Sequence, residues 1–406
     1  MTQTQERSRR QLAMMLAALV AVMPFSIDAY LPAMPQMAQA LGAHIHQVER
    51  SLSVFIFGVA LGQLCGGALS DVQGRRTVTL FGLAVYVAAT VALPFVGSVE
   101  GLLLWRFVQA VGGGMATVTV AAVVRDRFEG QEAAQMFALI GIITMMAPLA
   151  APMIGALLKQ FGGWQAIFVF LGVYAAAVAA LLYRRMPASV QPRRRFDRAL
   201  LRDIGANYRR VFRQPEALGF LFCQALCFSA MVVFLTESSF VYMELYHLGS
   251  KQYALAFGAN IFTMMFFNRV TAYSLRRTDA KNILIVGIAL QLVCNLAAFL
   301  LVCFGGLPPF AVLLGLMMVS VGTQGLIVAN TQACYMGYFK QEGGSANAVL
   351  GTVQFSLAGL IGWLTTQAHN GSAQVMPGMM LASTVAAIAL LWLFSRRVWL
   401  DKGRTA

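Results

Sequence analysis

The feature that most constrains this chain is a series of long apolar runs separated by short charged loops. Two of these runs, residues 52–69 and 78–96, flank a charged loop at 67–76. At about 1.5 Å per helical residue, each can cross a hydrocarbon core about 30 Å thick. The 406 residues are 59% hydrophobic and 11% charged, whereas soluble domains contain about 25% charged residues. Most of the chain must therefore face lipid or other helices in a membrane.

The hydropathy pattern predicts an all-α membrane protein with twelve transmembrane helices. One long polar segment divides them six and six, which indicates an internal duplication. We therefore expect an N-terminal six-helix half at 1–184, a cytoplasmic linker at 185–215 and a C-terminal half at 216–406 that ends in a short cytoplasmic tail. The predicted spans are 11–31, 48–69, 76–97, 101–124, 133–158, 164–183, 216–240, 252–275, 282–303, 309–334, 345–368 and 374–395.

The basic residues predict the orientation of the chain. The two tails, the even-numbered loops and the linker contain 25 of the 30 lysine and arginine residues. The positive-inside rule therefore places both termini and the linker in the cytoplasm. The same distribution explains the net charge of +14 without nucleic-acid binding. We interpret the first apolar run, which Asp28 and Pro32 interrupt, as a retained span and not as a cleaved signal peptide.

Charged residues inside the spans are candidates for function, because each costs at least a few kcal/mol at the bilayer centre unless it is paired or faces water. Asp28 and Arg106 lie at similar predicted depths in the outer half of the membrane, where they could meet. Burial and a nearby arginine have opposite effects on the protonation of a carboxyl group, so substrate arrival could switch it. The alternative is a static pair that joins two helices. Glu237 is a third charge in the outer half, whereas Arg269 lies nearer the cytoplasm and could equally be structural.

The loop at 67–76 reads G-x-L-x-D-x-x-G-R-R and contains Asp71, Gly74, Arg75 and Arg76. A two-helix hairpin with this loop resembles the signature of the major facilitator superfamily of transporters. Asp71 and Arg75 could form a cytoplasmic charge network with Asp126 and a helix end, and so act as a latch for one conformational state. Alternatively, these residues only determine topology.

Three further segments resemble the Bcr/CflA group of drug:proton antiporters. The sequence SIDAYLPAMP at 26–35 is similar to the first-span signature of that group. WRFVQAVGGG at 105–114 resembles the span-4 motif, with Arg106 and Gln109 in place. APLAAPMIG at 147–155 resembles the span-5 antiporter motif, in which we expect Pro148, Pro152 and Gly155 to produce a kink; Gly141 is a further candidate for this motif. The match is weaker at 240–242 and 257–260.

The resemblance implies proton-coupled export of small molecules by alternating access. We expect Asp28 to be the titrating group and Arg106 its modulator. The residues expected to line the substrate cavity are Tyr30, Gln109, Glu237 and Asn260. The C-terminal half departs from the group at Glu237, Ser239 and Arg269, and these polar and charged residues would also suit a zwitterionic or metal-chelating metabolite.

The sequence therefore predicts a monomeric antiporter of the bacterial inner membrane for drugs such as chloramphenicol- or bicyclomycin-like compounds. We expect no metal, cofactor or enzymatic activity, and we interpret the four histidines as solvated outer-loop residues. Two alternatives remain. A proton-coupled importer would use the same fold and acids, although the span-5 motif favours export. A membrane sensor or enzyme is disfavoured, because no nucleotide-binding loop or nucleophile constellation is apparent.

Overall fold

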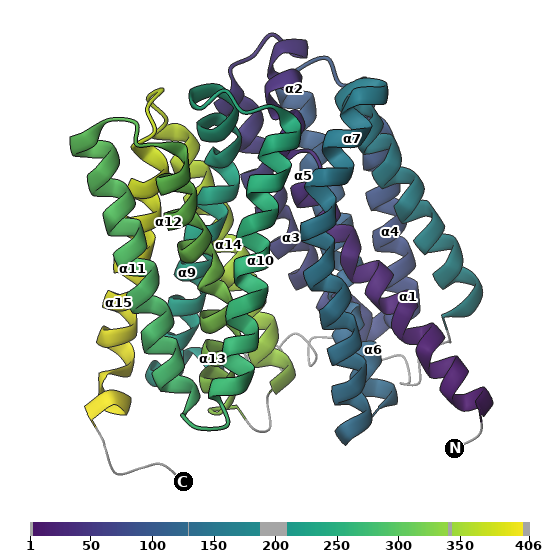
Figure 1. Ribbon diagram of the computed structural model, residues 1–406. Helices are drawn as coiled ribbons and strands as arrows, with labels where there is room; N and C mark the ends of the chain where they lie inside the picture. Colours follow the sequence, from purple (N-terminus) through teal and green to yellow (C-terminus); the bar gives the residue numbers. More distant parts are fainter. Residues whose placement is uncertain (1–2, 129, 187–208, 340–342, 401–406) are drawn as a thin grey trace. The chain divides into compact units, whose positions relative to one another are not determined.

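The structure is a computed structural model that describes residues 3–128, 130–186, 209–339 and 343–400. Within these residues every regular element is a helix (Figure 1). The chain forms two compact units. Unit 1 comprises Met1–Phe196 and Gly249–Gly258, and unit 2 comprises Asp197–Leu248 and Ala259–Ala406. Most of the predicted linker, 187–208, lies outside the described residues.

Unit 1 is built on close packing of three helices. In it, α3 and α4 both pack against α5, and α1 packs along α7. The approach of α4 to α5 is close because glycines meet there: a Cβ atom at either Gly82 or Gly112 would come within 2.6 Å of the other's carbonyl oxygen. Small residues allow this proximity between membrane helices. The elements are α1 (Gln3–Asp28), η1 (Leu31–Ala33), α2 (Met34–Ala40), α3 (Ile45–Gln73), α4 (Arg75–Ala92), η2 (Leu93–Phe95), α5 (Val99–Thr117), α6 (Thr119–Arg127) and α7 (Gly130–Arg185).

The long element α7 covers two of the predicted spans, 133–158 and 164–183. Its helical geometry is broken at Gly162 and Gly163, where Gly163 has φ 65°. Glycine is favoured in this left-handed region because it has no Cβ. The chain therefore turns at the position where the sequence separates the two spans.

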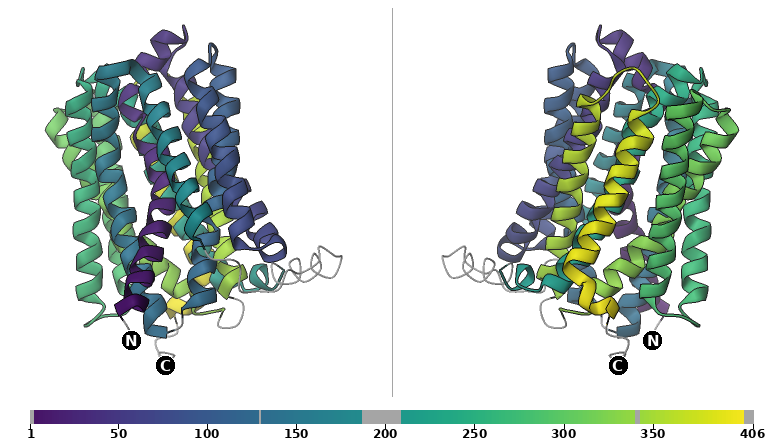
Figure 2. Two further views of the ribbon diagram at one scale, coloured as in Figure 1. Left: turned by 90° about the vertical axis from the view of Figure 1, so that its right-hand side faces the viewer. Right: turned by 90° about the vertical axis from the view of Figure 1, so that its left-hand side faces the viewer.

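Unit 2 is organised around α9, which packs against α13, α14 and α15. Its hydrophobic core contains Phe220, Leu221, Tyr335 and Leu350. The helix α10 starts in unit 1 and continues in unit 2 from Ala259 onward. The elements after α7 are α9 (Pro215–Ser239), the π-helix η3 (Phe240–Leu245), α10 (Ser250–Ser274), α11 (Ala280–Gly305), α12 (Phe310–Gly322), α13 (Gln324–Met336), α14 (Gly343–Gln367) and α15 (Val375–Leu400). Figure 2 shows the long helices of each unit running side by side.

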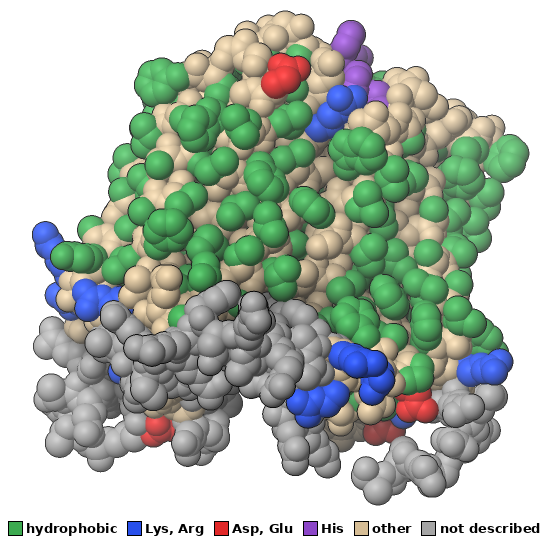
Figure 3. Space-filling model, turned by 180° about the vertical axis from the view of Figure 1, so that it is seen from behind, with side chains coloured by type: hydrophobic (Ala, Val, Ile, Leu, Met, Phe, Trp, Pro, Cys, Tyr) green, Lys and Arg blue, Asp and Glu red, His purple; other side chains and the backbone are tan. Residues whose placement is uncertain are grey.

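The described residues contain 10 helices that are long and apolar enough to cross a membrane. One of them, Met146–Arg185, covers parts of two predicted spans. The predicted span 252–275 forms α10 but is not among the ten, because Lys251, Arg269 and several amide side chains make it less apolar. Hydrophobic side chains dominate the visible surface in Figure 3, and some are almost fully exposed, including Phe161 at 81% and Phe304 at 86%. Such a surface is typical of a protein that contacts lipid.

Candidate functional site

Asp28 is the last residue of α1, at a break in the first span. The chain continues through the short helix η1, where Pro32 takes a position that requires no N–H donor. The Asp28 side chain is buried, with 4% of the residue exposed. In the part of the chain that the structure describes, its carboxyl group has no hydrogen bond or ion pair. A buried carboxylate without a partner is costly in its charged form.

Arg106 is fully buried in α5, and its positive charge is stabilised by two oxygen acceptors and by aromatic rings. One terminal nitrogen donates to Oε1 of Gln109 at 2.7 Å, and the other donates to the carbonyl oxygen of Ser26 at 2.9 Å. The guanidinium carbon lies 4.3 Å from the ring centroid of Tyr30 and 4.1 Å from that of Phe55. These contacts are cation–π interactions, which are strongest where water is excluded. The guanidinium is therefore fixed in place without a carboxylate.

A chain of buried hydrogen bonds extends from Arg106 to α4 and back to α1. Gln109 donates to the hydroxyl oxygen of Thr90 at 2.8 Å, and Thr90 donates to the backbone oxygen of Tyr86 at 2.6 Å. The Tyr86 hydroxyl lies 2.5 Å from the Ser26 hydroxyl. This network joins α1, α4 and α5, and it ends two residues before Asp28.

The expected contact between Asp28 and Arg106 is not found. Neither a hydrogen bond nor an ion pair joins the two side chains, both of which the structure describes. Arg106 instead reaches α1 through the carbonyl oxygen of Ser26. Equal depth along two helices does not fix which faces meet, so the sequence placed these residues at one level but could not orient them.

The predicted antiporter motif of α7 lies directly against the end of α1. A Cβ atom at Gly155 would overlap the carbonyl oxygen of Ala29, the residue that follows Asp28, whereas a Cβ at Gly141 would meet no described atom within 4 Å. Pro148 and Pro152 lie inside α7, but its non-helical backbone angles occur at Gly162 and Gly163. The motif therefore provides close packing beside Asp28. The non-helical angles mark the turn between the two predicted spans, and the kink at the prolines stays a prediction.

The charged loop between α3 and α4 forms a network within unit 1. Arg75 forms an ion pair with Asp71 of its own hairpin, and its Nε donates to Oδ2 of Asp126 in α6 at 3.3 Å. Arg76 donates to the backbone oxygen of Tyr183 near the end of α7 at 2.5 Å. Gly74 joins α3 to α4 with φ 91°, a value that glycine adopts readily. The structure thus brings together the residues predicted for the latch.

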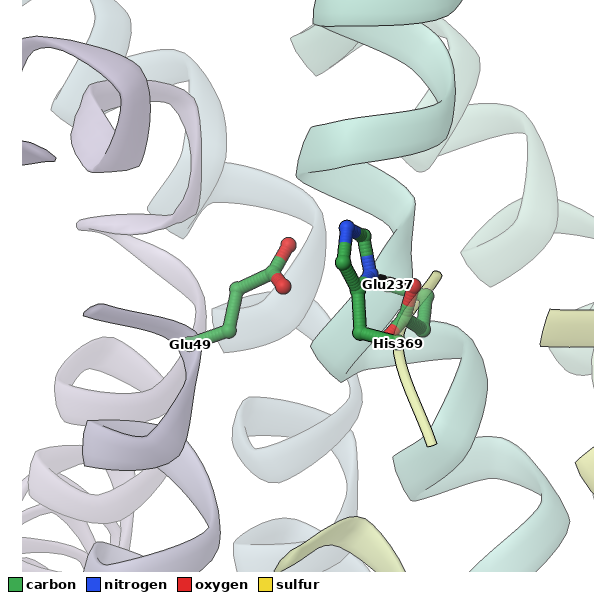
Figure 4. Close-up of side chains that lie close together, drawn as sticks. All are labelled: Glu49, Glu237 and His369. Carbon is green, nitrogen blue, oxygen red and sulfur yellow. Dashed lines mark hydrogen bonds and ion pairs between the residues drawn. The ribbon is translucent and has the colours of Figure 1, made fainter. Parts of the chain in front are cut away.

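In unit 2, Glu237 lies beside His369. The Glu237 side chain is fully buried in α9, and its Oε2 lies 3.3 Å from Nδ1 of His369 in the segment between α14 and α15 (Figure 4). The His369 side chain is only 7% exposed, so the interpretation of all four histidines as solvated is wrong for this one. Asn260 is buried in α10, whereas Arg269 of the same helix is exposed.

The burial of two polar residues, Glu49 and His369, was not predicted from the sequence. Glu49 is fully buried in the first turns of α3 and interacts electrostatically with Tyr30. An acid at the start of the predicted span 48–69 was the available signal. No sequence signal indicated the burial of His369, because that burial depends on how a loop folds back onto α9.

In the part of the chain that the structure describes, long apolar helices with buried charged and polar side chains indicate a multi-pass membrane protein. The chain belongs to the Major Facilitator Superfamily, whose family model matches residues 14–363. It is 28% identical over 400 residues to the "Bicyclomycin resistance protein homolog" of Haemophilus influenzae, covering 98% of this chain and 100% of that protein. It is 26% identical over 378 residues to "Multidrug resistance protein MdtL" of Klebsiella pneumoniae, covering 92% and 93%.

A "Chloramphenicol resistance protein" of Pseudomonas aeruginosa is 31% identical over 270 residues, covering 63% of this chain and 62% of that protein. These relatives confirm the resemblance to Bcr/CflA-type drug antiporters. Solved structures share the fold: the POT family transporter PepTSo has a TM-score of 0.76 at 14% identity, covering 97% of this chain and 99% of that one. The xylose transporter XylE from E. coli has a TM-score of 0.72 at 13% identity, covering 98% and 99%.

Proposed function

We propose that this protein is a proton-driven antiporter that exports small amphipathic molecules by alternating access, with Asp28 as its proton carrier. The observation that carries the proposal is the state of the Asp28 carboxyl group, which is buried and has no hydrogen-bond or ion-pair partner among the described residues. Such a group is stable when protonated and can release its proton only when water or a substrate reaches it. Proton exchange at Asp28 therefore depends on whether water or substrate can reach its carboxyl group.

Arg106 and Gln109 support this role by fixing the end of α1. Because the guanidinium binds the Ser26 carbonyl oxygen, it places a permanent positive charge two residues before the carboxyl group. Gly155 adds a second constraint, since it allows α7 to press against Ala29. Movement of α7 relative to α1 would change the surroundings of Asp28.

The ion pairs of Arg75 with Asp71 and Asp126 would stabilise one conformation of the α3–α4 hairpin relative to α6. A network that stabilises one state changes the rate of cycling without touching substrate. We place twelve helices, in two halves joined by a cytoplasmic linker at 185–215, in the bacterial inner membrane. Both termini are then cytoplasmic, and the transporter functions as a monomer. Tyr30, Gln109, Glu237 and Asn260 are proposed to line the cavity.

The relatives named for resistance to bicyclomycin, chloramphenicol and multiple drugs favour small-molecule drugs as substrates. Chloramphenicol is a suitable first probe because it is uncharged at neutral pH and is not trapped passively by a pH gradient. The test uses purified protein in proteoliposomes with an imposed pH gradient. An antiporter accumulates the drug on the acidic side, and a protonophore abolishes the accumulation. Accumulation on the alkaline side would identify a proton-coupled importer, and gradient-independent equilibration would contradict proton coupling.

A further inference from the structure

Unit 2 contains a buried carboxylate with an unused hydrogen-bond acceptor. Glu237 lies two residues before the end of α9, and its side chain is fully buried. Glu237 and His369 lie next to one another in Figure 4. Oε2 is 3.3 Å from Nδ1 of His369, whereas Oε1 has no hydrogen-bond partner among the residues described. Leaving a buried charged acceptor unpaired costs more than leaving a neutral one. The free oxygen is therefore a position where a donor would be bound strongly.

The charge of Glu237 is also incompletely balanced. Within the described part of the chain, no lysine or arginine forms an ion pair with it. Arg269, the charged residue of the neighbouring predicted span, is exposed to the surroundings of the helices. His369 carries a positive charge only when it is protonated. A buried carboxylate in these surroundings is stabilised by a ligand that brings its own positive charge.

Aromatic rings and an irregular backbone surround this end of α9. The ring of Phe240 meets the ring of His369 edge-on, with centroids 4.4 Å apart, and Phe234 packs against Tyr242 at 6.0 Å. Aromatic residues suit the apolar body of an amphipathic cation. The α-helix also widens here into a π-helix, at Phe240–Leu245, and turns of this type are frequent at functional sites.

We propose that Glu237 recognises the protonated amino group of a substrate, which donates an N–H hydrogen bond to Oε1 while His369 holds Oε2. This inference rests on the proposed efflux function and assigns its substrate class: amphipathic molecules that carry a primary or secondary ammonium group. An ammonium group matches the site because it supplies both the missing donor and the missing positive charge. A rigid Glu237–His369 pair that only joins α9 to the loop before α15 is the alternative.

Three probes and one matched control test the assignment by equilibrium binding to the purified protein. Doxorubicin has a primary ammonium group, tetraphenylphosphonium has a positive charge but no N–H donor, and chloramphenicol is neutral. We expect Glu237→Gln to weaken doxorubicin binding at least tenfold, to weaken tetraphenylphosphonium binding less, and to change chloramphenicol binding less than twofold. Glu244→Gln removes an exposed acid from the same segment and should leave all three affinities unchanged. His369→Asn should change doxorubicin affinity less than threefold, since Oε1 remains.

Thermal unfolding of each variant without ligand identifies loss of folding. Failure of the native protein to bind doxorubicin, unchanged doxorubicin affinity in Glu237→Gln, or an equal loss for all three probes would overturn the assignment. These outcomes are separable from those for efflux. Gradient-driven chloramphenicol transport with no effect of Glu237→Gln on doxorubicin would retain the antiporter and remove the ammonium site. Selective loss of doxorubicin binding in a protein that transports none of the probes would retain the site and remove the efflux function.

Discussion

Gly155 of α7 lies against the carbonyl oxygen of Ala29, one residue beyond the buried carboxyl group of Asp28. No larger residue can occupy this position without moving one of the two helices, because a Cβ atom would overlap that oxygen. The glycine thus determines how closely α7 approaches the break in the first span. It connects the span-5 motif to the proposed proton carrier through packing alone.

Gly155→Ala should impair transport and lower stability. The added methyl group overpacks the α1–α7 contact, for which a cost of about 1–3 kcal/mol is typical. Initial rates of chloramphenicol transport and the unfolding temperature in detergent measure the two effects. Gly141→Ala is the matched control, since it adds the same group to the same helix at a position where no described atom would lie within 4 Å. Equal behaviour of the two variants would show that the Ala29 contact has no role.

Asp28→Asn should abolish drug accumulation driven by a pH gradient while leaving chloramphenicol binding within a few fold of the native value. The amide keeps the shape of the carboxyl group but cannot carry a proton. Counterflow, which exchanges labelled for unlabelled drug without a gradient, should persist. If Asp28→Asn still accumulated the drug and Glu237→Gln did not, the proton carrier would lie in unit 2.

Arg106→Lys should lower the unfolding temperature almost as much as Arg106→Ala, although it keeps the positive charge. Lysine cannot reproduce the planar group that lies between Tyr30 and Phe55 and bonds both Gln109 and Ser26. Each buried acceptor left without a donor costs about 1–3 kcal/mol. Unfolding temperatures provide the measurement, and Arg269→Lys, at an exposed position of α10, provides the control. Native stability in Arg106→Lys would mean that only the charge matters.

Asp126→Asn should slow turnover more than Asp71→Asn. Asp126 is 12% exposed and joins Arg75 to a different helix, whereas Asp71 is 49% exposed and pairs with Arg75 four residues away. Exposed ion pairs between residues four apart, such as Asp71 and Arg75, contribute little to stability, about 0.3–0.5 kcal/mol. Transport rates at saturating drug separate the variants, while drug affinity should stay constant in both. A larger defect in Asp71→Asn would indicate that the α3–α4 loop acts through another contact.

The fold was largely predictable from the sequence because lipid requires long apolar helices, and their ends are marked by charged and glycine-containing loops. The residues of the candidate site were also identifiable, since charges such as Asp28 and Arg106 are rare inside spans. The contacts that these residues make could not be identified from the sequence. Whether Arg106 meets a carboxylate or a carbonyl oxygen depends on the rotation of two helices, and the burial of His369 depends on the path of a loop. Neither leaves a periodic pattern in the sequence.

The π-helix at Phe240–Leu245 affects how this region can be aligned with relatives. Tyr246 donates its backbone N–H to the carbonyl oxygen of Val241, five residues earlier, so this turn holds about one residue more than an α-helical turn. One extra residue in this turn shifts the side chains at its end by about 100° around the helix axis. A homologue with a regular helix here therefore needs a one-residue gap before the position of Leu245, where the π-helix ends, and an ungapped alignment that matches Glu237 correctly will pair the last residues of this segment with neighbours on the wrong face.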